Sequence, residues 1–305
     1  MTATAPAARR RRSPMSVGAW PLLFVGPLLL GVLIFYYHPI IGNLVTSFTT
    51  TNAFGGDVEF VGLDNYTELL SRPDLPSALG NTLLYTAIVL LGVPLSVVIA
   101  SMIELPGLKG ESLYRVLSFM PYLAIPVAIA QVWRIFFNGN FGLLNQALNA
   151  IGISDPPYWL STPGFSMLSV AVFGIWSSIG FNVIILSAGL KGIPRELYEA
   201  AELDGASAWR QFRSVTVPLL TPSIFFLTIM QAISGFQLFD ALYAMMGQGN
   251  PAMNESRSLV YLFYNEAFVL QNKAGGAAIA MFIVVLVGIM TAFQFWAQKK
   301  WVHYG

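Results

Sequence analysis

The chain of 305 residues contains 55% hydrophobic and 10% charged residues and carries a formal net charge of +1. A soluble domain contains about 25% charged residues, so this composition excludes an ordinary soluble protein and indicates a membrane protein. The sequence lacks cysteine and contains only two histidines, His38 and His303. This excludes thiolate chemistry and argues against a metal centre or a Ser–His catalytic pair, so we expect no catalytic residue and no metal site. The absence of a Gly-Lys dipeptide excludes a Walker A loop, and the near-zero net charge argues against nucleic acid as a partner.

Six apolar stretches are long enough to cross a lipid bilayer, which requires about 20 residues. The predicted fold class is therefore all-α, a polytopic membrane protein of six transmembrane helices. We expect a disordered basic tail at residues 1–16, a transmembrane domain at 17–301 and a short cytoplasmic tail at 302–305. The predicted spans are residues 17–37, 83–103, 116–135, 166–190, 224–246 and 276–296.

Lysine and arginine predict the orientation of the chain, because both are enriched on the cytoplasmic side of membrane proteins. With the N-terminus inside, 12 of the 16 basic residues lie on the cytoplasmic side. Both termini are therefore predicted to be cytoplasmic. The outer segments are about 45, 30 and 29 residues long, and none is expected to fold as an independent ligand-binding domain. The basic residues at or near the outer side are Arg72, Arg134, Arg257 and Lys273.

The long cytoplasmic loop at residues 191–223 is predicted to form two short helices at the membrane face. Residues 195–203 favour a helix, and Asp204-Gly205 is a turn signal that ends it. Ser207 is a capping residue for a second helix at about residues 208–215. The prolines expected to delimit these helices are Pro194 at the start of the first, and Pro218 and Pro222 between the second helix and the fifth span.

Three interpretations of this loop are open: a connector that rests on lipid headgroups, a structural cap on the helix bundle, and a docking site for a partner with a basic or polar groove. The first helix and its turn are acidic, with Arg195 as their one basic residue, and anionic lipid would repel them. Ala200 and Ala201 permit close approach of a partner, which favours docking. The acidic residues are Glu196, Glu199, Glu202 and Asp204.

The same loop carries a known order of residues. Glu199-Ala200-Ala201 is followed by Asp204-Gly205-Ala206, and then by Phe212, Pro218-Leu219 and Pro222. This order, just before the last two predicted spans, resembles the EAA loop of ABC-importer permeases.

The resemblance extends over most of the chain. Together, the matching stretches resemble the maltose/glycerol-phosphate branch of carbohydrate-importer permeases, and the end of the chain (KKWVHY, 299–304) resembles the first of the two paired permeases. Two places depart from the family pattern: His38 stands where a Tyr-Pro pair is usual, and residues 247–251 (GQGNP) are less compact than the usual Gly-Gly-Pro. The matching stretches are Tyr37-His38-Pro39, Ser47-Phe48, residues 60–66 (FVGLDNY), Asn81-Thr82, Arg115, Pro121, Trp133, residues 142–145 (GLLN), Phe236 and Phe239-Asp240.

The resemblance implies a type I ABC-importer permease fold in the cytoplasmic (inner) membrane. It implies a second homologous permease subunit, two ABC ATPase subunits that each receive one EAA loop, and an extracytoplasmic solute-binding protein that delivers the solute. ATP and Mg²⁺ bind in the ATPase subunits and drive alternating access. The chain itself is then a transport subunit without enzymatic activity or a cofactor of its own.

The resemblance also assigns ATPase coupling to residues of the loop. Glu199 is the first candidate for a charged contact with the ATPase, although a merely solvated acid is the alternative. Gly205 is expected to set the angle between the two short helices. The coupling set is Glu199, Ala200, Ala201, Asp204, Gly205, Ala206, Phe212 and Pro218.

Polar residues inside the predicted spans are candidates for the substrate path, because polar groups in a membrane are costly unless they have a function. Ser178 and Asn182 are four residues apart and share a helix face. Trp133 could stack on a sugar ring, although interfacial tryptophans also anchor proteins in the membrane. Helix packing is the alternative explanation for each of these residues. The candidate set is Trp133, Ser178, Asn182, Gln231, Ser234, Gln237 and Asp240.

The predicted function is a permease subunit of an ATP-driven importer for a sugar or sugar-like solute. A neutral sugar is favoured because Arg134 is the only basic residue near the predicted path. Glycerol phosphate, a glycerophosphodiester or another small solute is the alternative within this class. A stand-alone secondary transporter is the alternative from another class, but the sequence shows no convincing internal repeat and only one intramembrane acid, Asp240.

Overall fold

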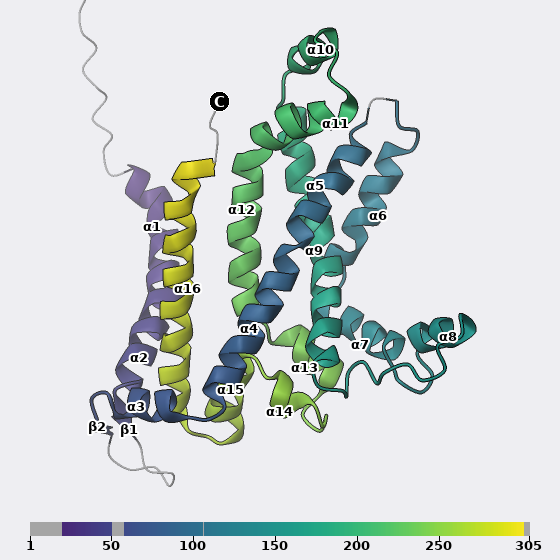
Figure 1. The fold of residues 1–305 in the computed structure, drawn as a ribbon. Helices are drawn as coiled ribbons and strands as arrows, with labels where there is room; N and C mark the ends of the chain where they lie inside the picture. Colours follow the sequence, from purple (N-terminus) through teal and green to yellow (C-terminus); the bar gives the residue numbers. More distant parts are fainter. Residues whose placement is uncertain (1–19, 51–57, 106, 302–305) are drawn as a thin grey trace, which may run out of the picture.

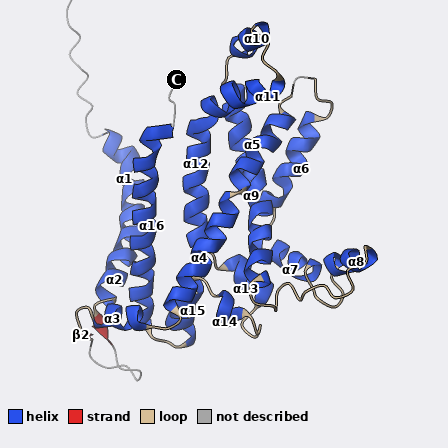
Figure 2. Cartoon of the chain, viewed as in Figure 1, coloured by secondary structure: helices blue, strands red, loops and turns tan. Residues whose placement is uncertain are grey.

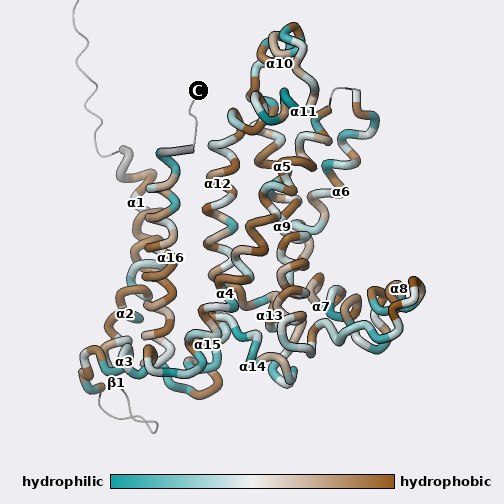
Figure 3. Tube along the Cα trace, in the orientation of Figure 1, coloured by the Kyte–Doolittle hydropathy of each residue, from teal (hydrophilic) through white to brown (hydrophobic). Residues whose placement is uncertain are grey.

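The structure is a computed structural model that describes residues 20–50, 58–105 and 107–301. The predicted tails at 1–16 and 302–305 lie outside the described residues. The described chain is a bundle of long helices with short helices at both ends and one small two-stranded sheet (Figure 1, Figure 2). Hydrophobic residues run along the long helices (Figure 3), as expected for segments that face lipid and one another.

Among the described residues, five helices are long and apolar enough to cross a membrane, or six if one bent pair counts as a single span. The first span consists of α1 (Trp20–Val32), the π-helical η1 (Leu33–Tyr37) and α2 (His38–Thr46). The second consists of α4 (Leu75–Leu90) and α5 (Gly92–Ile103), and the third of α6 (Glu111–Leu123) and α7 (Pro126–Phe136). The fourth is α9 (Phe165–Lys191), the fifth joins α11 (Ala208–Gln211), η2 (Phe212–Thr216) and α12 (Val217–Phe236), and the sixth is α16 (Lys273–Trp301).

Short elements gather at both ends of the bundle. At the end opposite α10 (Arg195–Leu203), β1 (Thr49–Thr50) pairs antiparallel with β2 (Glu59–Phe60) (Figure 1). This small sheet was not part of the all-α prediction. The other elements are α3 (Asp64–Ser71), α8 (Leu143–Ala150), α13 (Asp240–Met246), α14 (Met253–Ser256), α15 (Leu259–Tyr264) and η3 (Asn265–Val269).

The third span, predicted at residues 116–135, is sharply bent, because α6 and α7 meet at an angle of 98°. Ala124 and Ile125 between them are extended, with ψ of 152° and 119°. Pro126 disfavours helical geometry at the preceding residue and then starts α7 itself. The sequence predicted a single span here, and the structure divides it into two helices at Pro126.

Two further helix boundaries are wrong because helices continue through prolines. The first span runs through Pro39 to Thr46, and the second helix of the loop at residues 191–223 runs through Pro218 and Pro222 without a break to Phe236. A π-helical segment precedes Pro39 and another precedes Pro218; the wider π turn relieves the clash of a proline ring with the preceding turn.

Pro222 cannot donate to the carbonyl of Pro218, and the hydroxyl of Thr221 donates to that carbonyl instead, at 2.7 Å. The fifth span also ends earlier than predicted. The predicted span 224–246 stops at Phe236, and its last part is the separate helix α13.

The helices of the bundle approach closely where glycines lie between them. A Cβ atom at Gly180 on α9 would come within 2.5 Å of the carbonyl oxygen of Ser118 on α6. A Cβ at Gly235 on α12 would meet Thr86 on α4 at 2.6 Å. Small residues at such crossings allow membrane helices to pack backbone against backbone.

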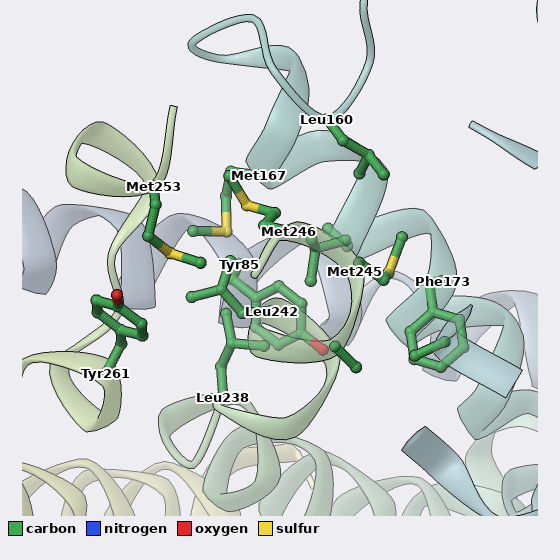
Figure 4. Packing of buried hydrophobic residues seen from close by; sticks show 14 of the residues in the cluster. Tyr85, Leu160, Met167, Phe173, Leu238, Leu242, Met245, Met246, Met253 and Tyr261 are labelled. Carbon is green, nitrogen blue, oxygen red and sulfur yellow. The ribbon is translucent and has the colours of Figure 1, made fainter. Parts of the chain in front are cut away.

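A methionine-rich cluster packs around α13 and the adjoining end of α9 (Figure 4). Met245 and Met246 on α13, Met167 on α9 and Met253 on α14 are all buried. Methionine fills irregular gaps well, and here it closes the space between the short helix α13 and the ends of the long helices.

Asparagines in the motif stretches tie the outer loops together. Asn65 donates to the carbonyls of Ser47 and Thr49 at 2.9 and 2.8 Å, and Asn81 donates to that of Glu255 at 2.6 Å. Asn145 donates to the carbonyl of Gly139 at 2.8 Å and accepts from the indole N–H of Trp159 at 2.6 Å. Asn250 donates to the carbonyl of Leu160 at 2.9 Å. These residues, several of which carried the family resemblance, therefore have structural roles.

Ion pairs link segments far apart in the sequence at the end of the bundle opposite α10 (Figure 1). Arg72, after α3, contacts Asp74 at 3.0 Å and Glu266 of η3 at 2.5 Å, and Arg257 contacts Asp74 at 2.7 Å. The hydrogen bond from Arg72 is the main reason that the pKa of the Asp74 carboxyl lies below its usual range. Arg72 in turn has a raised pKa, chiefly because of its hydrogen bond to Asp74.

Candidate functional site

The loop at residues 191–223 forms the predicted first helix and turn. The helix α10 covers Arg195–Leu203, and Gly205 adopts the left-handed conformation with φ of +73°. The Gly205 N–H donates to Glu202 at 2.9 Å and the Ala206 N–H donates to Ala201 at 2.9 Å. This is the Schellman arrangement that ends helices at glycine, so the predicted turn is confirmed.

The tip of this loop is open to solvent. The Glu199 side chain is 65% exposed and has one weak ion pair, with Arg195 at 3.7 Å. Leu203 is 90% exposed and Trp209 on α11 is 69% exposed. Glu199 and Leu203 are four residues apart on α10 and share a helix face, and exposed apolar residues grouped with polar ones are typical of protein interaction sites.

The predicted coupling residues occupy different places in this loop. Glu199, Ala200, Asp204 and Gly205 are exposed, whereas Ala201 and Ala206 are half-buried. Phe212 and Pro218 lie at the base of the loop, where Phe212 packs against the buried cluster of α5, α9 and α12. These last two residues therefore lie away from the exposed tip of the loop.

A central cavity of about 340 Å³ lies between α4, the bend of α6 and α7, α9, and α12. It brings together four of the seven predicted path residues: Ser178, Asn182, Gln231 and Ser234. Its described lining contains no charged side chain. The other lining residues are Tyr85, Val89, Pro121, Tyr122, Ala124, Pro126, Ile129, Phe173, Gly174, Ser177, Phe181, Met230 and Gly235.

Two amide side chains at this cavity have atoms without a hydrogen-bond partner. Asn182 is fully buried; its Nδ2 donates to the hydroxyl of Ser96 at 3.3 Å, but its Oδ1 accepts from no described group. Gln231, 8% exposed, has an unpaired Nε2. An unpaired buried polar atom costs about 1–3 kcal/mol, so the structure leaves one acceptor and one donor unsatisfied on residues that line the cavity.

The remaining path candidates do not line the central cavity. Trp133 packs in an aromatic cluster, with ring centroids 5.3 Å from Trp176 and 5.4 Å from Phe137. Gln237 lies exposed just past the end of α12. Asp240 is not within a span but starts α13, and with Arg134 it lines a separate cavity of about 290 Å³.

Sequence reasoning missed the aromatic and glycine residues of the cavity. Tyr122 stacks on Phe181 with ring centroids 5.3 Å apart, and Tyr85 is buried. Gly174 and Gly235 also line it. Glycines within otherwise apolar spans are the one sequence signal that could have indicated where helices converge.

A helical bundle that crosses the membrane around an uncharged cavity, with an exposed loop at one end, has the architecture of a membrane transport protein. Residues 75–303 match the family described as "Binding-protein-dependent transport system inner membrane component", and the chain belongs to this family.

Similar proteins span nearly the same length. The "sn-glycerol-3-phosphate transport system permease protein UgpA" of Agrobacterium fabrum is 35% identical, over 93% of this chain and 96% of that protein. The "Lactose transport system permease protein LacF" of Rhizobium radiobacter is 32% identical over 93% and 95%. The "Trehalose/maltose transport system permease protein MalF" of Thermococcus litoralis is 32% identical over 87% and 88%.

Solved structures share the fold. A chain of a bacterial ABC transporter involved in import of the acidic polysaccharide alginate superposes with a TM-score of 0.81 at 23% identity, over 92% of this chain and 96% of that one. A chain of the alginate transporter in complex with a periplasmic protein gives 0.82 at 22% identity, over 94% and 96%. The predicted type I importer permease fold is confirmed.

The chain is therefore a transmembrane permease subunit of an ABC importer in the inner membrane, and it works with a binding protein. The predicted family and general function are confirmed. This result decides against the stand-alone secondary transporter.

Proposed function

We propose that this permease carries a neutral sugar or oligosaccharide, and that the central cavity is its part of the path. The observation that carries the proposal is the described lining, which offers tyrosines, serines and two amides but no charge. Hydroxyl and amide groups exchange hydrogen bonds with sugar hydroxyls, and aromatic rings stack on the apolar faces of sugar rings. Asn182 and Gln231 have the unpaired atoms needed for such bonds.

A phosphorylated solute is the second candidate, because relatives of this chain are named for sn-glycerol-3-phosphate transport. A phosphate group is usually bound by arginine, lysine or a helix N-terminus. The described lining of the central cavity holds neither basic side chain; Arg134 lines the separate outer cavity. The neutral solute is therefore favoured.

Transport is powered by partner subunits. We infer that two ATPase subunits, which bind ATP and Mg²⁺, dock on this loop and on that of a second homologous permease. Support comes from the exposed acid Glu199 and the exposed Leu203 on α10. The exposed residues described on α1 are also largely apolar; Phe24, for example, is 77% exposed. Such a surface suits contact with lipid or with the second permease.

Both termini lie in the cytoplasm in this proposal. The described ends of α1 and α16 are at the same end of the bundle as α10 (Figure 1). Arginine and lysine are enriched in the sequence at this end.

Thermal stabilisation by ligand tests the solute class. The transporter is purified from its membrane in detergent and heated with an excess of a neutral disaccharide, sn-glycerol 3-phosphate or an acidic oligosaccharide. Selective stabilisation by the neutral sugar is expected, and it should disappear in Asn182→Leu but persist in Ser187→Ala, a buried serine outside the cavity. Stabilisation by sn-glycerol 3-phosphate alone would replace the neutral sugar with a phosphorylated solute.

Co-purification tests the coupling surface. The tagged normal chain should retain a second permease and ATPase subunits, whereas Glu199→Lys combined with Gly205→Trp should lose the ATPase and keep the second permease. Recovery of the normal chain without any ATPase would contradict the docking role of the loop.

A further inference from the structure

The helix α10 is attached weakly to the rest of the molecule. It has no buried residue, and both of its ends join non-helical segments, at Gly192–Pro194 and at Asp204–Ser207. Two end attachments define an axis, and a helix held only at its ends is free to roll about that axis. Since rolling would change which side chains face a partner, a third attachment is needed to fix the docking face.

Tyr198 supplies this third attachment. Its hydroxyl is 2.9 Å from the hydroxyl of Thr216, 18 residues further along the chain. Within the part of the chain that the structure describes, no other side chain of α10 makes a hydrogen bond or ion pair with a residue outside that helix. Tyr198 is half-buried and Thr216 is 5% exposed, so this bond is partly shielded from water.

A cavity of about 570 Å³ lies between α10 and the bundle, lined by both residues. The Tyr198 ring reaches past this hollow space to the fifth span. Because the cavity separates α10 from the bundle, the hydrogen bond is a direct link across it. The hydroxyl pair is thus a specific link between two bodies that otherwise meet loosely.

Thr216 occupies a mechanically significant place in the fifth span. It is the last residue of the π-helical segment η2, and the next N–H, of Val217, donates to the carbonyl of Phe212. From there α12 continues without interruption to Gln231 and Ser234 at the central cavity. Displacement at Thr216 therefore moves a helix that lines the solute path.

We propose that the Tyr198–Thr216 hydrogen bond is a strut that fixes the roll of α10 and transmits its displacement to α12. Both residues are positioning residues, and the inference rests on the proposed docking of ATPase subunits on α10. It adds to that proposal the particular link through which docking and cavity are connected.

Removal of single hydroxyls tests the strut in the assembled importer, reconstituted into vesicles with its partner subunits and binding protein. The measured quantity is the amount of solute transported per ATP hydrolysed, together with the amount of ATPase that co-purifies. Tyr198→Phe and Thr216→Val should each lower transport per ATP about three- to tenfold, the effect of losing one net hydrogen bond. The ATPase should remain bound in both variants.

Three comparisons separate a strut from a general structural effect. The double variant should be no worse than either single one, because both remove the same bond. Thr216→Ser keeps the hydroxyl and should restore coupling. Tyr158→Phe, which removes a hydroxyl bonded to Asn140 at 3.1 Å in the outer loop, should behave as the normal chain.

The outcomes distinguish the strut from the proposed function. Normal transport per ATP in Tyr198→Phe, or additive losses in the double variant, would overturn the strut while leaving docking intact. Absence of ATPase from the normal complex would overturn the proposed docking itself, and the strut with it.

Discussion

Replacement of Gln231 by leucine should make the protein more stable and less active. The Gln231 residue is only 8% exposed, and its Nε2 has no acceptor among the described groups. Removing an unpaired buried donor recovers about 1–3 kcal/mol, and leucine has a similar volume. At about 2 °C per kcal/mol for a chain of this size, the thermal midpoint should rise by about 2–6 °C.

The same substitution should lower solute uptake at least about tenfold, because a solute hydroxyl would face an apolar side chain and lose its bond. The assays are thermal unfolding in detergent and uptake by reconstituted vesicles. A stable but less active variant fits a site that leaves polar groups unpaired for its ligand.

Ser187→Ala is the matched control for this experiment. Ser187 lies on α9, is 4% exposed and also has an unpaired hydroxyl, but it does not line the central cavity. Its replacement should raise the midpoint without changing uptake. A lower midpoint in Gln231→Leu, or an equal loss of uptake in both variants, would refute the reasoning.

Three further predictions concern the loop, the packing and the outer ion pairs. Gly205→Val should lower the free energy of unfolding by about 1–2 kcal/mol, because the φ of +73° at this position suits glycine. Recovery of the ATPase in co-purification should fall, and unchanged recovery would show that the turn tolerates a side chain. Gly180→Ala should lower the thermal midpoint, because the added Cβ would lie 2.5 Å from a carbonyl oxygen. Overpacking of this kind destabilises a folded protein by about 1–3 kcal/mol. Gly288→Ala, where nothing lies within 4 Å, is its control, and equal midpoints would contradict the close packing. Because folding lowers the pKa of Asp74, its ionised carboxyl stabilises the folded protein in full above the carboxyl's usual pKa of 3.8. This stabilisation is lost as the pH falls through the lower pKa of the folded state. Thermal midpoints measured from pH 6 to pH 2 should fall less in Asp74→Asn, and parallel curves for the two proteins would count against this assignment.

Much of the loop at residues 191–223 could be predicted from sequence because its signals are local. A helix-forming run, a glycine and a capping serine act on neighbouring residues, and α10, the Gly205 turn and the Ser207 cap are all present; the Ser207 hydroxyl accepts from the Arg210 N–H at 3.4 Å. The number of spans was also readable, since hydrophobic length follows from membrane thickness.

The prolines were less predictable because their effect depends on neighbouring bonds. Pro126 bends the third span sharply, whereas Pro39, Pro218 and Pro222 lie within continuous helices. Whether a π turn or a threonine hydroxyl compensates for the missing N–H is decided by the local fold. A proline alone does not specify which result occurs.

The sequence by itself determined the membrane class, the span count, the helix and turn of the loop at residues 191–223, and the family, because hydrophobicity, local turn chemistry and a motif are properties of consecutive residues. Only the tertiary structure separated Ser178, Asn182, Gln231 and Ser234, which share a cavity, from Trp133, Gln237 and Asp240, which do not line it. The helical period states which residues share a face of one helix, but the cavity forms where four spans meet. Their crossing is set by glycine contacts and by the bend at Pro126, both of which are interactions between distant parts of the chain.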